Sequence, residues 1–114
     1  EETTKIDRRR TINGVSPNFV HSMDATALTL TINRCIKDGI HDYSVVHDSF
    51  GVHAHFVPRL ADSIRESFVE MYSKTDVLDE FYENVVDVIP DLEEPPSRGE
   101  LDITGVLDSK YFFS

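Results

Sequence analysis

The chain has 114 residues, enough for one domain with a single modest hydrophobic core. Hydrophobic residues make up 39% and charged residues 28%, which excludes a disordered chain, and no apolar run approaches the roughly 20 residues of a membrane span. The single cysteine, Cys35, excludes an internal disulfide and a zinc site built from several cysteines.

Acidic residues outnumber basic ones, and the formal net charge is -10. Such a charge argues against a free-standing nucleic-acid-binding domain, because phosphate contacts need basic side chains. The acidity is concentrated in residues 58–114, which carry fourteen acidic and five basic side chains. Only the first half could face phosphates, through Arg8, Arg9 and Arg10, unless these arginines form only a solvated basic turn.

The first predicted elements are a polar start and one helix. Residues 1–16 are expected to form a polar N-terminal segment, with turn signals at Asn13-Gly14 and Ser16-Pro17. Ser22 is a suitable N-cap for the helix that follows, whose apolar residues recur at helical spacing. Gly39 can take the left-handed conformation that ends such a helix.

A change of hydrophobic period then predicts a hairpin. Residues 43–46 and 52–56 are expected to be two short strands around the polar break at residues 47–51. Together with helices before and after it, the hairpin gives an α+β fold class, with two antiparallel strands and flanking helices.

Two more helices and an aromatic tail complete the predicted organisation. Pro58 suits the first turn of one helix, and residues 77–88 form the next, which Pro90 ends. Residues 95–99 are expected to be an extended linker. Aromatic side chains at residues 111–113 are expected to pack against a neighbour, since three exposed ones together would be unusual.

Asp48 is the first candidate for chemistry, because it follows an apolar strand and lies close to Gly51 at the hairpin tip. A carboxylate held there suits a magnesium ion, a hard cation that takes charged oxygen and keeps several waters. The alternative is that Asp48 only makes a hydrogen bond from its side chain to the backbone of the turn.

The histidines are weaker candidates. His53 and His55 would share one face of a strand, but no cysteine or third histidine stands at a usual zinc spacing. His47 adjoins the tip carboxylate. His21 would stand at a helix start, where unpaired amides favour phosphate, although one histidine there is weak support. Asp24 is more simply explained as a first-turn charge than as a catalytic acid.

Two stretches of the chain carry a resemblance to a known family. Residues 17–24 read Pro-Asn-Phe-Val-His-Ser-Met-Asp, and residues 47–51 read His-Asp-Ser-Phe-Gly. Together they resemble the C-terminal part of the single-subunit RNA polymerases, which are the bacteriophage T7-like enzymes and their mitochondrial relatives. The second stretch is similar to motif C, the palm hairpin of that family. The resemblance runs from about Gly14 to Ser114.

The resemblance implies a DNA-directed RNA polymerase that adds ribonucleotides to an RNA 3′ end by two-magnesium nucleotidyl transfer, with Mg²⁺ as cofactor. It implies that Asp48 is a metal ligand, that His47 lies close to the RNA 3′ end, and that His21 lies beside the template–RNA hybrid. The end Phe112-Phe113-Ser114 would pack near the active centre. The implied partners are the DNA template, the RNA transcript, ribonucleoside triphosphates and the rest of the polymerase, with no membrane.

Other parts of that family are missing from this sequence: the motif A aspartate, the motif B helix and the promoter-binding domain. Residues 17–114 are therefore expected to be the C-terminal palm segment of a longer or split enzyme. They would be a fragment of a larger right-hand polymerase fold and inactive as an isolated piece. Motif C in particular is expected to hold only half of a metal site.

Two other functions stay open. A family A DNA polymerase shares a His-Asp hairpin, although its aspartate is usually followed by glutamate and Ser49 follows here. A non-enzymatic acidic interaction module would use the hairpin only as structure. Among RNA polymerases, Gly51 favours the bacteriophage branch and the aromatic tail favours the mitochondrial one. We expect a bacteriophage protein in the host cytoplasm, with the mitochondrial matrix as the alternative.

Overall fold

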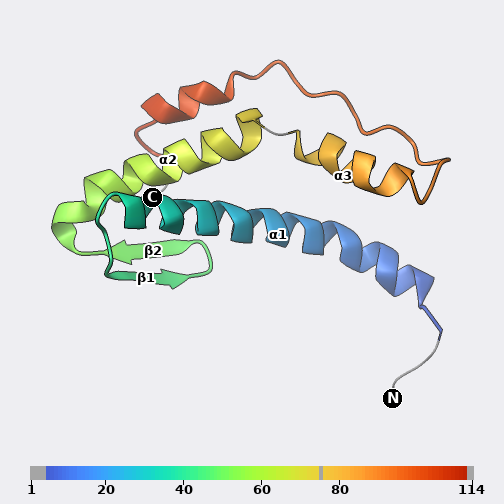
Figure 1. The fold of residues 1–114 in the computed structure, drawn as a ribbon, viewed down its shortest axis with the longest axis horizontal. Coiled ribbons are helices and arrows are strands. Elements are labelled where there is room, and N and C mark those ends of the chain that lie inside the picture. Colours follow the sequence, from blue (N-terminus) through green and yellow to red (C-terminus); the bar gives the residue numbers. More distant parts are fainter. Residues whose placement is uncertain (1–4, 75, 113–114) are drawn as a thin grey trace. The chain divides into compact units, whose positions relative to one another are not determined.

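The computed structural model describes residues 5–74 and 76–112. In chain order the elements are α1 (Arg8–Lys37), β1 (Tyr43–Val46), β2 (Ser49–Val52), the 3-10 helix η1 (Ala54–Phe56), α2 (Val57–Lys74), α3 (Val77–Val86) and the 3-10 helix η2 (Ile103–Asp108) (Figure 1). The α+β class is confirmed, because helices flank a two-stranded antiparallel sheet. The chain divides after residue 57 into two compact units, each described here by itself.

Helix α1 begins much earlier than the sequence predicts. The carboxylate of Asp7 is its N-cap and accepts hydrogen bonds from the backbone amides of Arg9 and Arg10, both at 3.1 Å. The prediction of an N-cap at Ser22 is wrong, because Ser22 lies inside the helix and its hydroxyl donates to the carbonyl of Phe19 at 2.7 Å. The helix therefore runs through residue 16, where a polar segment was expected to give way to the palm segment.

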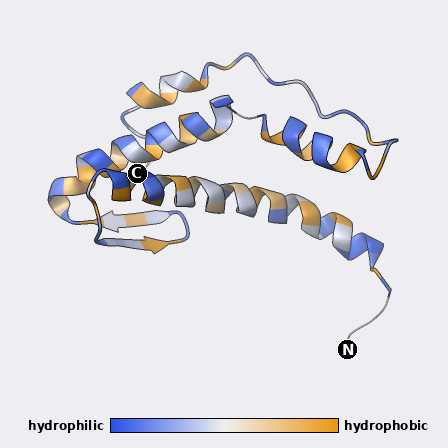
Figure 2. Ribbon diagram, in the orientation of Figure 1, coloured by the Kyte–Doolittle hydropathy of each residue, from blue (hydrophilic) through white to orange (hydrophobic). Residues whose placement is uncertain are grey.

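Gly14 and Pro17 lie inside this helix instead of forming turns. An interior proline costs a helix roughly 3 kcal/mol, so the rest of α1 has to offset that loss. The cap at Asp7 contributes at one end, and the buried side chains of Thr31 and Cys35 contribute toward the other. Figure 2 shows hydrophobic and hydrophilic residues interspersed along α1. The first half of the helix therefore has no single apolar stripe from which the sequence could have predicted it.

The end of α1 follows the sequence prediction. Gly39 has a φ of 81°, the left-handed conformation that glycine adopts without a steric penalty. The amide of Gly39 donates to the carbonyl of Ile36 at 3.1 Å, and the amide of Ile40 donates to the carbonyl of Cys35 at 2.9 Å. This pair of bonds is a Schellman motif, and the fully buried Ile40 side chain anchors the chain as it leaves the helix.

The hairpin is tighter than predicted. Strand β1 is confirmed, but β2 pairs Ser49 with Val46, so only His47 and Asp48 form the turn. The prediction of a strand over residues 52–56 is wrong in its bounds, since β2 ends at Val52 and residues 54–56 form η1. The register places Val45 opposite Phe50 on one face of the sheet, and both side chains are half-buried.

The second unit is built on α2. Its apolar stripe is confirmed, because Leu60, Ile64 and Met71 are all buried. The C-terminal end packs on the same helix: the guanidinium Nε of Arg65 donates to the carbonyl of Ser109 at 2.9 Å.

The predicted packing of the aromatic tail is confirmed for one of its residues. The ring of Phe112 meets that of Phe68 edge-on, with centroids 4.9 Å apart. Tyr111 is 86% exposed, so the packing expected of all the tail aromatics holds for Phe112 but not for its neighbour. Phe113 and Ser114 lie outside the described residues.

The third helix confirms the prediction over residues 77–86, and its start is fixed by Asp76. The carboxylate of Asp76 accepts hydrogen bonds from the amides of Leu78 and Asp79, both at 3.2 Å. It also forms an ion pair with Arg98, which lies between α3 and η2. The hydrogen bond from the Asp79 amide, followed by the Arg98 charge, holds the pKa of the Asp76 carboxyl below its ordinary value.

Replacing Asp76 with alanine is expected to speed hydrogen exchange of the Leu78 and Asp79 amides several-fold, because both lose their acceptor. Asp76→Asn keeps an acceptor and should retain most of the protection. Since the pKa of Asp76 is lowered, its stabilisation is present above the ordinary value and is lost as the pH falls through the lowered one. Equal exchange rates in Asp76→Ala and the unaltered chain would contradict this account of the cap.

Candidate functional site

The tip of the hairpin has a backbone conformation that its side chains disfavour. His47 is the first residue of the two-residue turn and has a φ of 54°, the only positive φ among the described residues other than glycine. Glycine is favoured at such a position because a side chain crowds the backbone there. Residues held in sparsely populated backbone conformations gather at functional sites, and His47 adjoins Asp48 in this turn.

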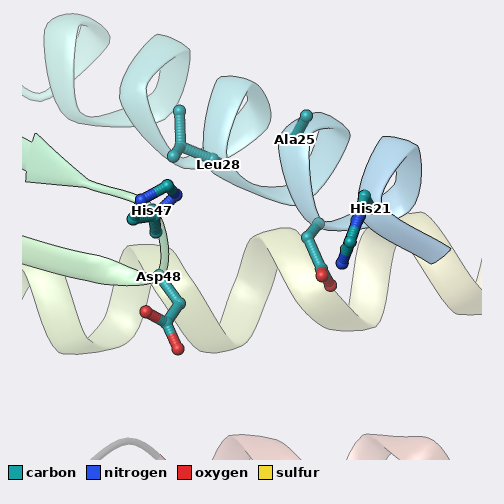
Figure 3. Close-up of a pocket in the computed structure, with 6 residues that line it drawn as sticks. His21, Ala25, Leu28, His47 and Asp48 are labelled. Carbon is teal, nitrogen blue, oxygen red and sulfur yellow. The ribbon is translucent and has the colours of Figure 1, made fainter. Parts of the chain in front are cut away.

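The three candidate residues come together at one place. His21 from α1 and the turn residues His47 and Asp48 line a pocket of about 650 Å³, together with Asp24, Ala25 and Leu28 of α1 (Figure 3). That volume lies within the range of small-ligand sites. In Figure 3 the side chains of His21 and Asp48 point in the same direction, one from α1 and the other from the hairpin tip.

All four polar side chains of this pocket are exposed: His21, Asp24, His47 and Asp48. In the part of the chain that the structure describes, the carboxylate of Asp48 has neither a hydrogen bond nor an ion pair. The turn-bond alternative for Asp48 requires a backbone amide as donor, and no such bond is formed among these residues. The carboxylate oxygens are therefore available to a ligand from outside this segment.

Asp48 suits a magnesium ion as one ligand among several. Mg²⁺ is commonly held by one or two carboxylates, with water and substrate phosphate completing its shell. Over residues 5–74 and 76–112, no three histidine, cysteine, aspartate or glutamate side chains gather as a metal site. Asp48 therefore fits such an ion as one of its ligands.

The structure does not support the alternative of a zinc site at His53 and His55. These residues do not share a strand face, because the chain turns into η1 at Ala54. Their rings stack instead with centroids 6.4 Å apart, and the ring of His55 lies 3.7 Å from that of Phe56. The arrangement is an aromatic cluster on one side of the hairpin base.

Sequence reasoning placed His21 and Asp24 at a helix start, and the structure places them in the middle of α1. The favourable environment of free amides at a helix N-terminus is therefore not available to His21. The role of Asp24 as a pocket residue was missed for the same reason. Its spacing of three residues from His21, which puts both side chains on one side of a helix, was the signal that could have identified it.

No helix in the described part of the chain is both long enough and apolar enough to cross a membrane.

Comparisons with known proteins agree with one another. A protein-family model described as DNA-dependent RNA polymerase matches residues 1–91. The chain is 38% identical to DNA-directed RNA polymerase 1, mitochondrial, of Arabidopsis thaliana, over 99% of this chain and 12% of that protein. It is 40% identical to DNA-directed RNA polymerase 2, chloroplastic/mitochondrial, of the same plant, over 99% of this chain and 11% of that protein.

A third relative is similar in length to the chain. DNA-directed RNA polymerase 1A of Nicotiana tabacum is 37% identical over 99% of this chain and 73% of that protein. By contrast, the chain spans only about a tenth of the length of the two Arabidopsis relatives.

Proposed function

The chain belongs to the DNA-dependent RNA polymerase family, in its T7-like single-subunit branch, and on that basis we propose that it is the C-terminal palm segment of a DNA-directed RNA polymerase. Residues 17–114 would form this segment, and α1, which begins at Arg8, runs across its start. Its task is to supply Asp48, His47 and His21 to an enzyme that adds ribonucleotides to an RNA 3′ end.

The observation that carries this proposal is the shared pocket. His21 lies on α1 and Asp48 lies at the hairpin tip, yet both line the same 650 Å³ space with His47. These three residues belong to the two stretches that resemble the family. Their convergence supports one functional site and argues against two unrelated surface motifs.

The proposed reaction is nucleotidyl transfer. The 3′ hydroxyl oxygen of the RNA attacks the α-phosphorus of a ribonucleoside triphosphate, a new phosphodiester bond forms, and pyrophosphate leaves with the electrons of the broken P–O bond. Two magnesium ions, when bound, stabilise the charge on the attacking and leaving oxygens. In this chain Asp48 would hold magnesium, because its exposed carboxylate lacks a partner among the described residues.

The neighbouring residues position this carboxylate and the nucleic acid. The left-handed backbone at His47 directs Asp48 away from the strands, and the β1–β2 pairing fixes both residues at the tip. His47 would face the RNA 3′ end, and His21 would face the template–RNA hybrid. The second carboxylate and the nucleotide-binding side chains would come from the remainder of the polymerase.

The alternatives are less well supported. A family A DNA polymerase accounts for the hairpin but not for the similarity to RNA polymerases over 99% of the chain. The hypothesis of an acidic interaction module explains neither the pocket nor the left-handed backbone at His47. The organellar names of the two Arabidopsis relatives favour the mitochondrial alternative over a bacteriophage protein, and we therefore propose an organellar polymerase.

The proposed function is tested by transcription with a full-length polymerase that contains this chain. Incorporation of labelled UMP should require a DNA template, stop when EDTA removes divalent metal, and return when Mg²⁺ is added in excess. Incorporation of deoxyribonucleotides in preference to ribonucleotides would instead identify a DNA polymerase.

A further inference from the structure

Asp24 lines the candidate pocket but has no part in the function proposed above. We propose that Asp24 is a specificity-determining residue whose carboxylate accepts a hydrogen bond from a ribose 2′-hydroxyl of the RNA strand. This inference rests on the proposed function, because it assumes that RNA enters the pocket.

The position of Asp24 favours contact with a ligand over contact with the protein. Asp24 and His21 are three residues apart on α1, so their side chains lie on the same side of the helix. Both side chains are exposed, and both line the pocket that Asp48 borders from the hairpin tip. Within the described residues, Asp24 has no hydrogen-bond or ion-pair partner.

The chemistry of the lining disfavours a direct contact between Asp24 and a phosphate. None of the described lining residues is lysine or arginine, and two of them are aspartates. A carboxylate repels a phosphate unless a cation lies between them, but it accepts readily from a hydroxyl group. The α1 side of the pocket therefore suits a sugar edge and not the charged backbone of a nucleic acid.

A ribose hydroxyl is the sugar group that fits both polar residues of α1. The 2′-hydroxyl of RNA donates one hydrogen bond and accepts others, and DNA lacks it. Asp24 can accept from this hydroxyl, and the imidazole of His21 can donate to it. The apolar side chains of Ala25 and Leu28 in the same lining suit the carbon face of the sugar.

The test compares primers that differ by one hydroxyl. The full-length polymerase extends RNA primers with either a ribose or a 2′-deoxyribose at each of the last few positions, and kcat/KM is measured for each. Asp24→Ala is expected to lower the ribose preference about tenfold at one primer position, and Asp24→Asn less, since its amide oxygen still accepts. Asp62→Ala, an exposed aspartate on α2 outside the pocket, is the matched control and should leave the ratio unchanged.

Three outcomes would overturn the assignment. An unchanged ribose preference in Asp24→Ala would mean that Asp24 does not contact the hydroxyl. An equal loss of rate on ribose and deoxyribose primers would indicate a purely structural role. A higher Mg²⁺ requirement with an unchanged preference would make Asp24 a metal-site residue instead.

A binding measurement separates this proposal from the proposed function. Anisotropy of a labelled RNA–DNA hybrid and of a matched DNA duplex gives the ratio of their Kd values without catalysis. If Asp24→Ala removes the hybrid preference in a protein that does not polymerise, the proposed function fails and the hydroxyl assignment stands. If the protein polymerises and Asp24→Ala leaves both ratios unchanged, only the hydroxyl assignment fails.

Discussion

Changing Asp48 to asparagine is expected to lower nucleotide incorporation by the full-length polymerase about 10³-fold or more. The amide keeps the shape of the side chain but loses the charge that holds a hard cation, and such a metal stabilises the transition state by several kcal/mol. The measurement is single-turnover extension of an RNA primer by one nucleotide at saturating Mg²⁺.

The fold should be unaffected by this change. Asp48 is exposed and has no hydrogen bond or ion pair within the described residues, so removing its charge opens no cavity and leaves no group unpaired. Asp42, another exposed aspartate close to the hairpin, offers a matched control as Asp42→Asn, which should retain activity. Full activity in Asp48→Asn would leave the carboxylate as an ordinary turn residue.

The isolated chain of 114 residues is expected to show no template-dependent polymerisation. Over its described residues no three metal-binding side chains gather as one site, and the motif A aspartate of the family is missing from this sequence, so we expect its two-ion site to be incomplete. The pocket also offers no lysine or arginine among its lining residues to hold a triphosphate.

The test is incorporation of labelled nucleotide by the purified chain, with Asp48→Asn as a background control. Joining the chain to the upstream part of a polymerase should create activity, because the missing carboxylate and nucleotide-binding residues are then present. Incorporation by the isolated chain above the Asp48→Asn background would show that it holds a complete active site.

The sequence predicted an element correctly where its own residues favour that structure or its end. Gly39 predicted the end of α1, and the β-branched residues of β1 predicted the first strand. The start of α1 could not be predicted in this way, because Gly14 and Pro17 normally disfavour a helix but lie inside this one. The hairpin turn was predicted too wide, because Ser49, Phe50 and Gly51 pair with β1 and only His47 and Asp48 form the turn.

The site was only partly readable from the sequence. The hairpin spacing alone did not decide whether Asp48 is a metal ligand or a turn residue. Only the resemblance to a family indicated that Asp48 and His21 belong to one site. The misplaced helix start then gave Asp24 a first-turn role, which hid its position three residues from His21 on one side of α1. Residues that line one pocket from a helix and from a hairpin far apart in the sequence leave no periodic pattern along the chain.

The most direct test of the central claim, that Asp48 holds a catalytic metal, is cleavage mapping with Fe²⁺ in the full-length polymerase. Fe²⁺ in the magnesium site, with ascorbate and peroxide, generates hydroxyl radicals that cut the backbone near the ion. Cuts are expected within a few residues of Asp48, suppressed by excess Mg²⁺ and absent in Asp48→Asn. An enzyme that is cut elsewhere but not at this hairpin, while remaining active in Mg²⁺, would contradict the assignment.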